Sequence, residues 1–316
     1  MYEYGLARRR LLLGAAATLV SSTRSWAYAA SPAARHAVSP AGEVAASNVA
    51  AAHVQIAAIE RRVGGRLGVA ALNTGTQARI AYRADERFPM CSTFKLPLVA
   101  LILSRVDAGK ERLDRFVTYR DDPRISYAPI TRQHMAEGGM SVEALCAAAI
   151  CYSDNIAANV LLESVAGPPA LTAYFRRLSD RDSRLDRNEP ALNSAITRDP
   201  RDTTKPAAMV ETLRKLLLGT VLSADSRKQL IDWLIANTTG DHRLRAGLPA
   251  DWRIGDKTGT GEHGATNDVA ILWPAPAQAP ILITAYLVGS MAHRTDLEAA
   301  QADVARIVAA AFAAPI

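Results

Sequence analysis

The chain is poor in cysteine and aromatic residues, and it lacks two motifs that many hydrolases carry. Its 316 residues include three cysteines, and 6% are aromatic. Neither Gly-x-Ser-x-Gly nor His-Glu-x-x-His occurs, which excludes the usual histidine-dependent serine hydrolase and the common zinc-protease helix. No cysteine–histidine spacing is typical of a metal site, so we expect neither a metal nor a cofactor.

The apolar run near the N-terminus is too short for a permanent membrane span. Arg8-Arg9-Arg10 precedes the apolar segment 11–20, and Ala27-Tyr28-Ala29 follows it. This order predicts a signal peptide over residues 1–29, cleaved near Ala29, with Sec or twin-arginine export left open. A buried N-terminal helix is the alternative. We expect a flexible arm over residues 30–44 and a periplasmic or secreted protein without a stable membrane anchor.

The positive charge is modest and partly confined to the predicted leader. The formal net charge is +6, and residues 1–29 contribute four arginines and one glutamate to it. No basic run with interleaved aromatic residues appears, so we expect no nucleic-acid partner. The composition, 49% hydrophobic and 22% charged, is that of an ordinary globular protein. Separately, we expect a monomer.

The order of apolar patterns predicts an α/β (α+β) fold. Short strand patterns occur at both ends of the chain, over 67–72, 78–82, 254–260, 267–273 and 281–288. Helical patterns lie at 43–63 and after a capping box at Thr295–Glu298. We therefore predict a five-stranded antiparallel sheet flanked by terminal helices, in a domain of residues 45–88 and 236–316. Residues 89–235 would form a helical domain, with a cleft between the two.

Ser92-x-x-Lys95 supplies a nucleophile and a base at the start of the helical block. Ser92 could cap a helix, and Lys95 would share its face one turn later. A lysine packed against a hydroxyl in a desolvated site can have a lowered pKa and act as a base. The motif alone is weak evidence, because it occurs by chance about once in a chain of this size.

Two further motifs add polar groups downstream. Ser153-Asp154-Asn155 lies between two helical runs, where a plain helix cap is the alternative reading. Segment 257–261, Lys-Thr-Gly-Thr-Gly, reads as a strand that lets a ligand approach its backbone and that offers a cation to a carboxylate. An ordinary edge strand protected by a lysine is the alternative for that segment.

Together these motifs resemble those of the class A serine β-lactamases. Segment 185–193, Leu-Asp-Arg-Asn-Glu-Pro-Ala-Leu-Asn, resembles the omega loop of that family, which here would span residues 185–202. Arg187 and Asp202 stand where the family closes this loop with a salt bridge. Tyr127 resembles the aromatic wall of the family's site. The resemblance extends from about residue 44 to the last helix.

The resemblance implies that the chain is a serine hydrolase of cyclic amides that confers β-lactam resistance, with the fold predicted above. It assigns catalytic roles to Ser92 as nucleophile, Ser153 as proton relay, Glu189 as activator of the deacylating water, and Lys95. It assigns substrate binding to Asn155, Asn193, Lys257, Thr258, Thr260, Tyr127 and Arg243. The oxyanion hole would consist of the backbone N–H groups of Ser92 and Thr260. Whether Lys95 or Glu189 deprotonates Ser92 stays open, as do the substrate spectrum and the response to mechanism-based inhibitors.

The chain departs from the family's pattern at an arginine position. Members often carry an arginine on the strand after Lys-Thr-Gly, where this chain has Thr266. We expect Arg243 to supply that guanidinium, a surface arginine being the alternative.

The cysteines depart from the pattern too. Cys146 matches half of a disulfide found in some members, but the partner position is Val99. Cys91 lacks the partner found in some carbapenem-hydrolysing members, because Gly261 occupies that position. We therefore expect neither disulfide.

Two other acylated serine proteins remain as alternatives: a penicillin-binding D-Ala-D-Ala peptidase and a β-lactam sensor. Both share the nucleophile motif, but neither is expected to carry the glutamate and asparagine of the omega loop. Glu189 and Asn193 therefore favour a β-lactamase.

Overall fold

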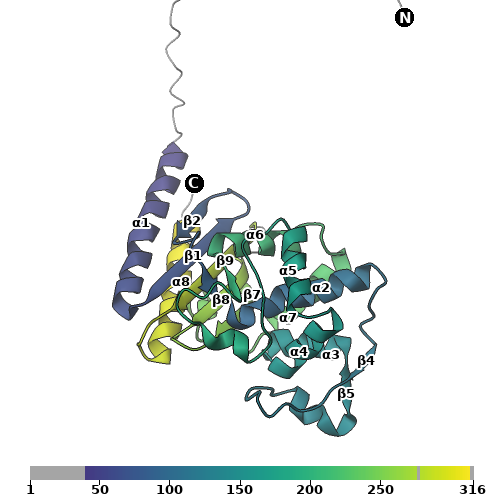
Figure 1. Cartoon of the computed structure of the whole chain (residues 1–316). Coiled ribbons are helices and arrows are strands. Elements are labelled where there is room, and N and C mark those ends of the chain that lie inside the picture. Colours follow the sequence, from purple (N-terminus) through teal and green to yellow (C-terminus); the bar gives the residue numbers. More distant parts are fainter. Residues whose placement is uncertain (1–39, 276–277, 314–316) are drawn as a thin grey trace, which may run out of the picture. The chain divides into compact units, whose positions relative to one another are not determined.

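The structure is a computed structural model that describes residues 40–275 and 278–313 (Figure 1). All of them belong to one compact unit, residues 38–316. The predicted signal peptide and its cleavage site lie outside the described residues. The first helix begins at Pro40, so residues 40–44 are helical and the prediction of a flexible arm up to residue 44 was wrong there. No helix within the described ranges is long and apolar enough to cross a membrane.

The predicted five-stranded antiparallel sheet is confirmed. Its strands, in spatial order, are β2 (Arg79–Tyr82), β1 (Arg66–Asn73), β9 (Ile281–Val288), β8 (Thr266–Trp273) and β7 (Arg253–Thr260). The central strand β9 is buried along its whole length, as its continuous apolar sequence indicates. Strand β7 forms one edge, and Lys257 pairs with Val269 of β8 there. The sheet therefore leaves one side of the Lys-Thr-Gly segment open to other groups.

Helices cover both faces of the sheet. Helices α1 (Pro40–Val63) and α8 (Arg294–Ala313) lie side by side over one face (Figure 1). A hydrophobic cluster joins them to the sheet through residues such as Ile56, Ile283 and Val304. Helix α8 begins at Arg294, so the predicted capping box is wrong: Thr295 lies inside the helix. The Glu298 carboxylate instead accepts hydrogen bonds from the side chains of Arg294 and Arg243.

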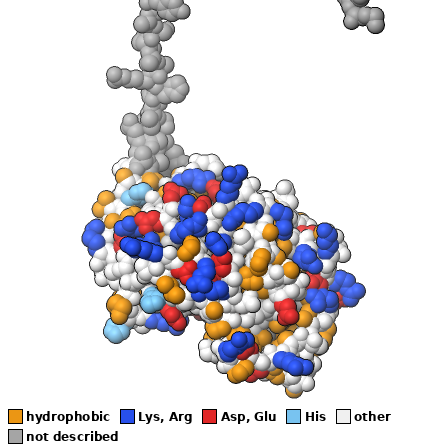
Figure 2. Space-filling model, viewed as in Figure 1, with side chains coloured by type: hydrophobic (Ala, Val, Ile, Leu, Met, Phe, Trp, Pro, Cys, Tyr) orange, Lys and Arg blue, Asp and Glu red, His pale blue; other side chains and the backbone are white. Residues whose placement is uncertain are grey.

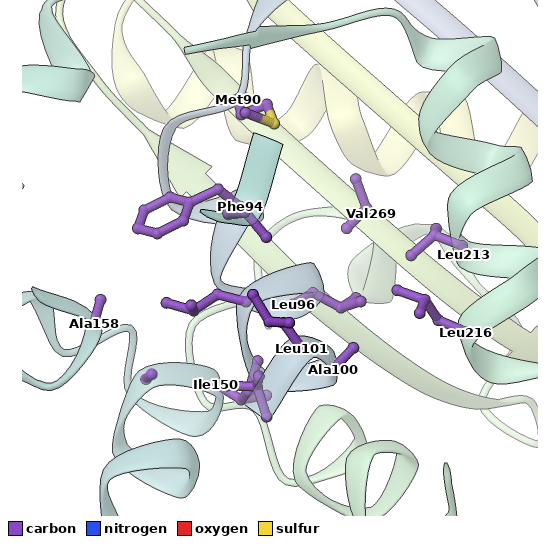
Figure 3. Packing of buried hydrophobic residues seen from close by; sticks show 14 of the residues in the cluster. Met90, Phe94, Leu96, Ala100, Leu101, Ile150, Ala158, Leu213, Leu216 and Val269 are labelled. Atoms are coloured by element: carbon purple, nitrogen blue, oxygen red, sulfur yellow. The ribbon is translucent and has the colours of Figure 1, made fainter. Parts of the chain in front are cut away.

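The opposite face carries the helical part of the chain. Its helices are α2 (Lys95–Asp107), α3 (Val142–Cys151), α4 (Asn155–Ser164), α5 (Pro168–Arg177), α6 (Pro206–Leu217) and α7 (Ala224–Ile235). Helix α2 is central, since every residue from Lys95 to Leu103 is buried. Figure 3 places Leu96, Ala100 and Leu101 of α2 in one group with residues of α3, α6 and β8. This packing fixes the start of α2 against the sheet.

Short elements complete the fold and hold the loops that carry polar motifs. They are the strand pairs β3 (Phe88–Pro89) with β6 (Thr203–Thr204) and β4 (Phe116–Thr118) with β5 (Gly139–Ser141), and the 3-10 helices η1 (Cys91–Phe94), η2 (Thr131–Glu137), η3 (Ala191–Ser194) and η4 (Leu244–Gly247). On the face drawn in Figure 2, basic and acidic side chains are interspersed rather than gathered by sign. That surface has no extended basic patch of the kind that binds nucleic acid.

Candidate active site

Ser92 lies in the 3-10 turn η1, which runs directly into α2. The residue that caps α2 is Phe94, without a side-chain cap bond, so the expectation that Ser92 caps the helix was wrong. Its hydroxyl is therefore free for other partners: it accepts a hydrogen bond from Lys95 Nζ at 2.9 Å and lies 3.3 Å from Glu189 Oε1. A Cβ on Gly259 would lie 2.7 Å from Met90 O, so the edge strand can pass this close to the turn only as glycine.

Lys95 is fully buried and connects three motifs. Its Nζ donates to Ser92 Oγ at 2.9 Å, to Ser153 O at 2.8 Å and to Asn155 Oδ1 at 2.5 Å. It also lies 3.2 Å from Glu189 Oε1. Burial lowers the pKa of Lys95, and the negative charge of Glu189 opposes that shift. The amine is thus placed to exchange a proton with the serine or the carboxylate.

Glu189 is buried and reaches the nucleophile from the omega loop. Its Oε1 faces Ser92 and Lys95, while Oε2 accepts a hydrogen bond from Asn193 Nδ2 at 2.5 Å. Asn159 of α4 fixes the backbone of Glu189 in two places, accepting from its N–H at 3.0 Å and donating to its carbonyl at 2.9 Å. Among the residues that the structure describes, none bonds to the buried Asn193 Oδ1. That oxygen is an acceptor available to a water molecule beside the carboxylate.

An ion pair between a partly exposed arginine and a buried aspartate closes the omega loop, as the resemblance implied. Arg187 Nε lies 2.6 Å from Asp202 Oδ2. The other oxygen of Asp202 accepts from the backbone N–H groups of Asp186 and Arg187. The Asp202 carbonyl in turn accepts from Met90 N at 2.9 Å, next to the nucleophile turn. The loop that carries Glu189 is therefore tied to the segment that carries Ser92.

Ser153 stands between the two buried lysines. It lies in the short connection between α3 and α4, where its backbone φ is 57°. Its hydroxyl accepts from Lys257 Nζ at 3.0 Å and lies 3.4 Å from Lys95 Nζ. Asp154 caps α4 through Ala157 N, so the middle residue of the motif has a structural role.

Lys257 lies on the edge strand β7 with its side chain fully buried. Its Nζ donates to Ser153 Oγ and to Thr258 O, both at 3.0 Å. Burial, reinforced by repulsion from Lys95, lowers the pKa of Lys257 to about 7. The buried carboxylates of Asp256 and Asp268 oppose this shift, and burial raises the pKa of each of them.

Arg243 supports β7 from inside the protein. It is 1% exposed, which rules out the surface-arginine alternative. Its guanidinium donates to Gly259 O and Asn267 O, both at 2.8 Å, and to Thr260 Oγ1 at 2.6 Å. Thr266 lies opposite Thr260 in β8. The guanidinium therefore contacts β7 at Gly259 and Thr260.

The remaining predicted residues lie at the edges of this group. Tyr127 is 49% exposed, and its carbonyl accepts from Asn155 N at 3.2 Å. The Thr258 hydroxyl is 2.5 Å from that of Thr239. Direct contacts thus join Ser92, Lys95, Ser153, Asn155, Glu189, Asn193 and Lys257 into one cluster. Thr258 and Thr260 adjoin it on β7, and Tyr127 is linked to it only through its backbone.

The three cysteines are buried, and none of them is in a disulfide. A Cβ on Gly261 would lie 2.7 Å from Cys91 Sγ, so these two positions are in close contact. Within the described part of the chain, no group of three or more histidine, cysteine or acidic side chains could hold a metal ion.

Sequence reasoning missed three supporting residues, Asn159, Asn237 and Thr239. Asn159 follows Asn155 by one helical turn, and this spacing could have revealed that the two lie on the same face of α4. Asn237 and Thr239 lie in an irregular turn after α7, and no sequence pattern marked them.

Comparison with known proteins agrees with this geometry. A family model described as "Beta-lactamase enzyme family" matches residues 51–312. β-Lactamase L2 of Stenotrophomonas maltophilia is 49% identical over 89% of this chain and 91% of its own length. The carbapenem-hydrolysing β-lactamase KPC of Klebsiella oxytoca is 48% identical over 73% of this chain and 78% of its own.

Solved structures give the same result. The ancestral GNCA class A β-lactamase is 59% identical with a TM-score of 0.81, covering 83% of this chain and 100% of that chain. The putative class A β-lactamase PenP of Rhodopseudomonas palustris is 51% identical with a TM-score of 0.80, covering 83% and 99% respectively. The chain therefore belongs to the class A β-lactamases, serine hydrolases that open the β-lactam ring and confer resistance to these antibiotics.

Proposed function

We propose that this protein hydrolyses the β-lactam amide of penicillins and cephalosporins through an acyl-enzyme on Ser92, which water activated by Glu189 then releases. Ser92 Oγ attacks the lactam carbonyl carbon, and the carbon–nitrogen bond of the ring breaks. The backbone N–H groups of Ser92 and Thr260 stabilise the oxyanion that forms.

Proton transfer in acylation follows the contacts of the two lysines and two serines. The hydroxyl proton of Ser92 passes to Lys95 or to Glu189, since both lie within reach of Ser92 Oγ. Ser153 gives its proton to the departing ring nitrogen. Lys257 and Lys95, whose ammonium groups both face the Ser153 hydroxyl, favour that transfer and the return of a proton to Ser153.

Deacylation depends on Glu189 and Asn193. Glu189 takes a proton from a water molecule that Asn193 Oδ1 helps to hold, and the water attacks the ester carbonyl. The ester bond breaks, the Ser92 oxygen regains a proton, and a ring-opened carboxylic acid leaves.

Substrate recognition rests on the walls of the site. Asn155 donates to the acylamido side chain, and the half-exposed Tyr127 packs against the substrate. Lys257, Thr258 and Thr260 hold the substrate carboxylate, and Arg243 reinforces that binding through its bond to Thr260 Oγ1.

The observation that carries this proposal is the position of the Glu189 carboxylate against both Ser92 and Asn193. A D-Ala-D-Ala peptidase or a β-lactam sensor needs only the acylated serine. A carboxylate poised beside it, with an acceptor free for water, favours hydrolysis of the adduct.

We also propose that residues 1–29 are a cleaved signal peptide and that the mature enzyme acts in the periplasm or outside the cell as a monomer. Its division into an α/β domain and a helical domain, residues 89–235, belongs to the same proposal. Mechanism-based inhibitors would acylate the same serine.

Steady-state hydrolysis by the purified mature protein tests the function. We expect loss of the lactam absorbance of a penicillin and a cephalosporin, with many turnovers per enzyme, and no turnover by Ser92→Ala. An oxyimino-cephalosporin and a carbapenem in the same panel would define the spectrum. A single stoichiometric acylation without turnover, or cleavage of a D-Ala-D-Ala peptide in its place, would contradict the proposal.

A further inference from the structure

The turn after α7 bridges two parts of the site. Thr238 donates to Cys151 O through both its N–H and its hydroxyl, each at 2.9 Å. Cys151 lies two residues before Ser153. On the other side, a Cβ on Gly240 would collide with the carboxylate of Asp256 in β7. The turn is therefore held tightly between the Ser153 connection and the substrate-binding strand.

A chain of hydrogen bonds runs through this turn to the Thr258 hydroxyl. Arg245 donates to Asp256 Oδ1 at 2.5 Å, and Asn237 Nδ2 donates to Asp256 Oδ2 at 2.6 Å. The Thr239 hydroxyl lies 2.8 Å from Asn237 Oδ1 and 2.5 Å from Thr258 Oγ1. Asp256, Asn237 and Thr258 are all buried. The hydrogen bonds thus begin at the ion pair of the partly exposed Arg245 with the buried Asp256, and they end at Thr258.

Counting the hydroxyl protons of Thr239 and Thr258 leaves two possible arrangements of these hydrogen bonds. The Asp256 carboxylate fixes the Asn237 amide, whose NH2 group points at Asp256 and whose oxygen points at Thr239. Thr239 has one hydroxyl proton, which goes either to Asn237 Oδ1 or to Thr258 Oγ1. In the first arrangement Thr258 donates to Thr239 and has no proton for a ligand. In the second, Thr258 accepts from Thr239 and its own proton is free.

Exchange between the arrangements leaves the buried Asn237 Oδ1 paired. When the Thr239 hydroxyl turns away from Asn237 Oδ1, that oxygen still accepts from Thr239 N at 3.1 Å. The usual cost of an orphaned buried carbonyl is therefore avoided. In the second arrangement the Thr258 hydroxyl proton has a partner only when a bound ligand supplies an acceptor.

We propose that Thr239 is a positioning residue that turns its hydroxyl toward Thr258 when a β-lactam carboxylate binds, so that Thr258 donates to that carboxylate. This inference rests on the proposed function, in which Thr258 contacts the substrate carboxylate. Hydrogen bonds in such a chain polarise one another, and an anionic acceptor at its end strengthens it. Thr239 and Asn237 thereby favour carboxylate-bearing substrates without touching them.

The test compares a penicillin with its methyl ester, which keeps the ring but lacks the anionic acceptor. Thr239→Val preserves shape and removes the hydroxyl, whereas Thr239→Ser keeps it. We expect Thr239→Val to lower kcat/KM for the penicillin about two- to tenfold, the effect of one hydrogen bond, and to leave kcat/KM for the ester nearly unchanged. Thr239→Ser should behave like the wild type on both substrates.

A double-mutant cycle isolates the contact. In a Thr258→Val background, Thr239→Val should cause no further loss on the penicillin. Equal losses on acid and ester, no loss on the acid, failure of Thr239→Ser to retain activity, or full additivity with Thr258→Val would overturn the inference. Thr239→Ala replaces Thr239→Val if the latter does not fold. A wild-type protein that does not hydrolyse the penicillin would contradict the proposed function itself.

Discussion

Lys95 and Lys257 come from distant segments, are both fully buried, and meet at the hydroxyl of Ser153. Their other contacts differ. Lys95 has the Glu189 carboxylate at 3.2 Å, together with an amide oxygen and a hydroxyl. Lys257 donates to a hydroxyl and a carbonyl, and the negative charges of Asp256 and Asp268 raise its pKa against the effect of burial.

This difference indicates a division of labour. Lys95 lies beside a base and a nucleophile, so a proton can move among the three groups without leaving the site. Within residues 40–275 and 278–313, no acidic side chain is hydrogen-bonded to Lys257, so a substrate anion could neutralise its charge. The region around Lys95 is therefore suited to proton transfer, and the region around Lys257 to binding.

Replacing each lysine by arginine should show the largest difference between their roles. Arginine keeps the charge but does not deprotonate. We expect Lys95→Arg to lower kcat/KM for a penicillin about 100- to 10,000-fold, because a group that exchanges protons is lost. Lys257→Arg should cost about tenfold, the loss of one well-placed charged hydrogen bond. Steady-state kinetics on both variants measures this, and equal losses would contradict the division.

The pH dependence of kcat/KM should also distinguish the two lysines, with a smaller effect. The pKa of Lys257 is lowered to about 7, and the ammonium form attracts the substrate carboxylate. The ratio of kcat/KM for a penicillin to that for its methyl ester should therefore be highest below pH 7 and fall as pH rises through that value. Proton transfer by Lys95 is common to both substrates and cancels in the ratio.

Lys257→Arg is the matched control for this profile. Arginine stays charged over the whole range, so the ratio should become independent of pH. A flat profile for the wild type, or the same fall in Lys257→Arg, would remove Lys257 as the source.

The sequence predicted the sheet well, because strands follow from local apolar patterns. It also supplied the candidate reacting groups, whose roles stay a prediction. Alternating or continuous apolar runs define strands, and β9 matches its predicted bounds of 281–288. Ser92, Lys95 and Glu189 were identified from short motifs and a family resemblance. The structure brings all three within hydrogen-bonding distance.

Helix starts and supporting contacts were harder to predict. Both cap predictions, at Ser92 and at Thr295, were wrong because tertiary partners of Ser92 and Glu298 compete with the local cap. The support of Glu189 by Asn159, and of Thr258 by Thr239, joins segments far apart in the chain. Local sequence propensities do not predict contacts between such distant segments.

The central claim is that Glu189 makes the acylated serine hydrolysable, and Glu189→Gln tests it most directly. Intact-protein mass spectrometry after brief mixing with a penicillin should find this variant almost fully carrying one opened penicillin, while the wild type is unmodified at the end of turnover. The double variant that combines Ser92→Ala with Glu189→Gln should form no adduct. A Glu189→Gln enzyme that turns over like the wild type, with no adduct detected, would contradict the claim.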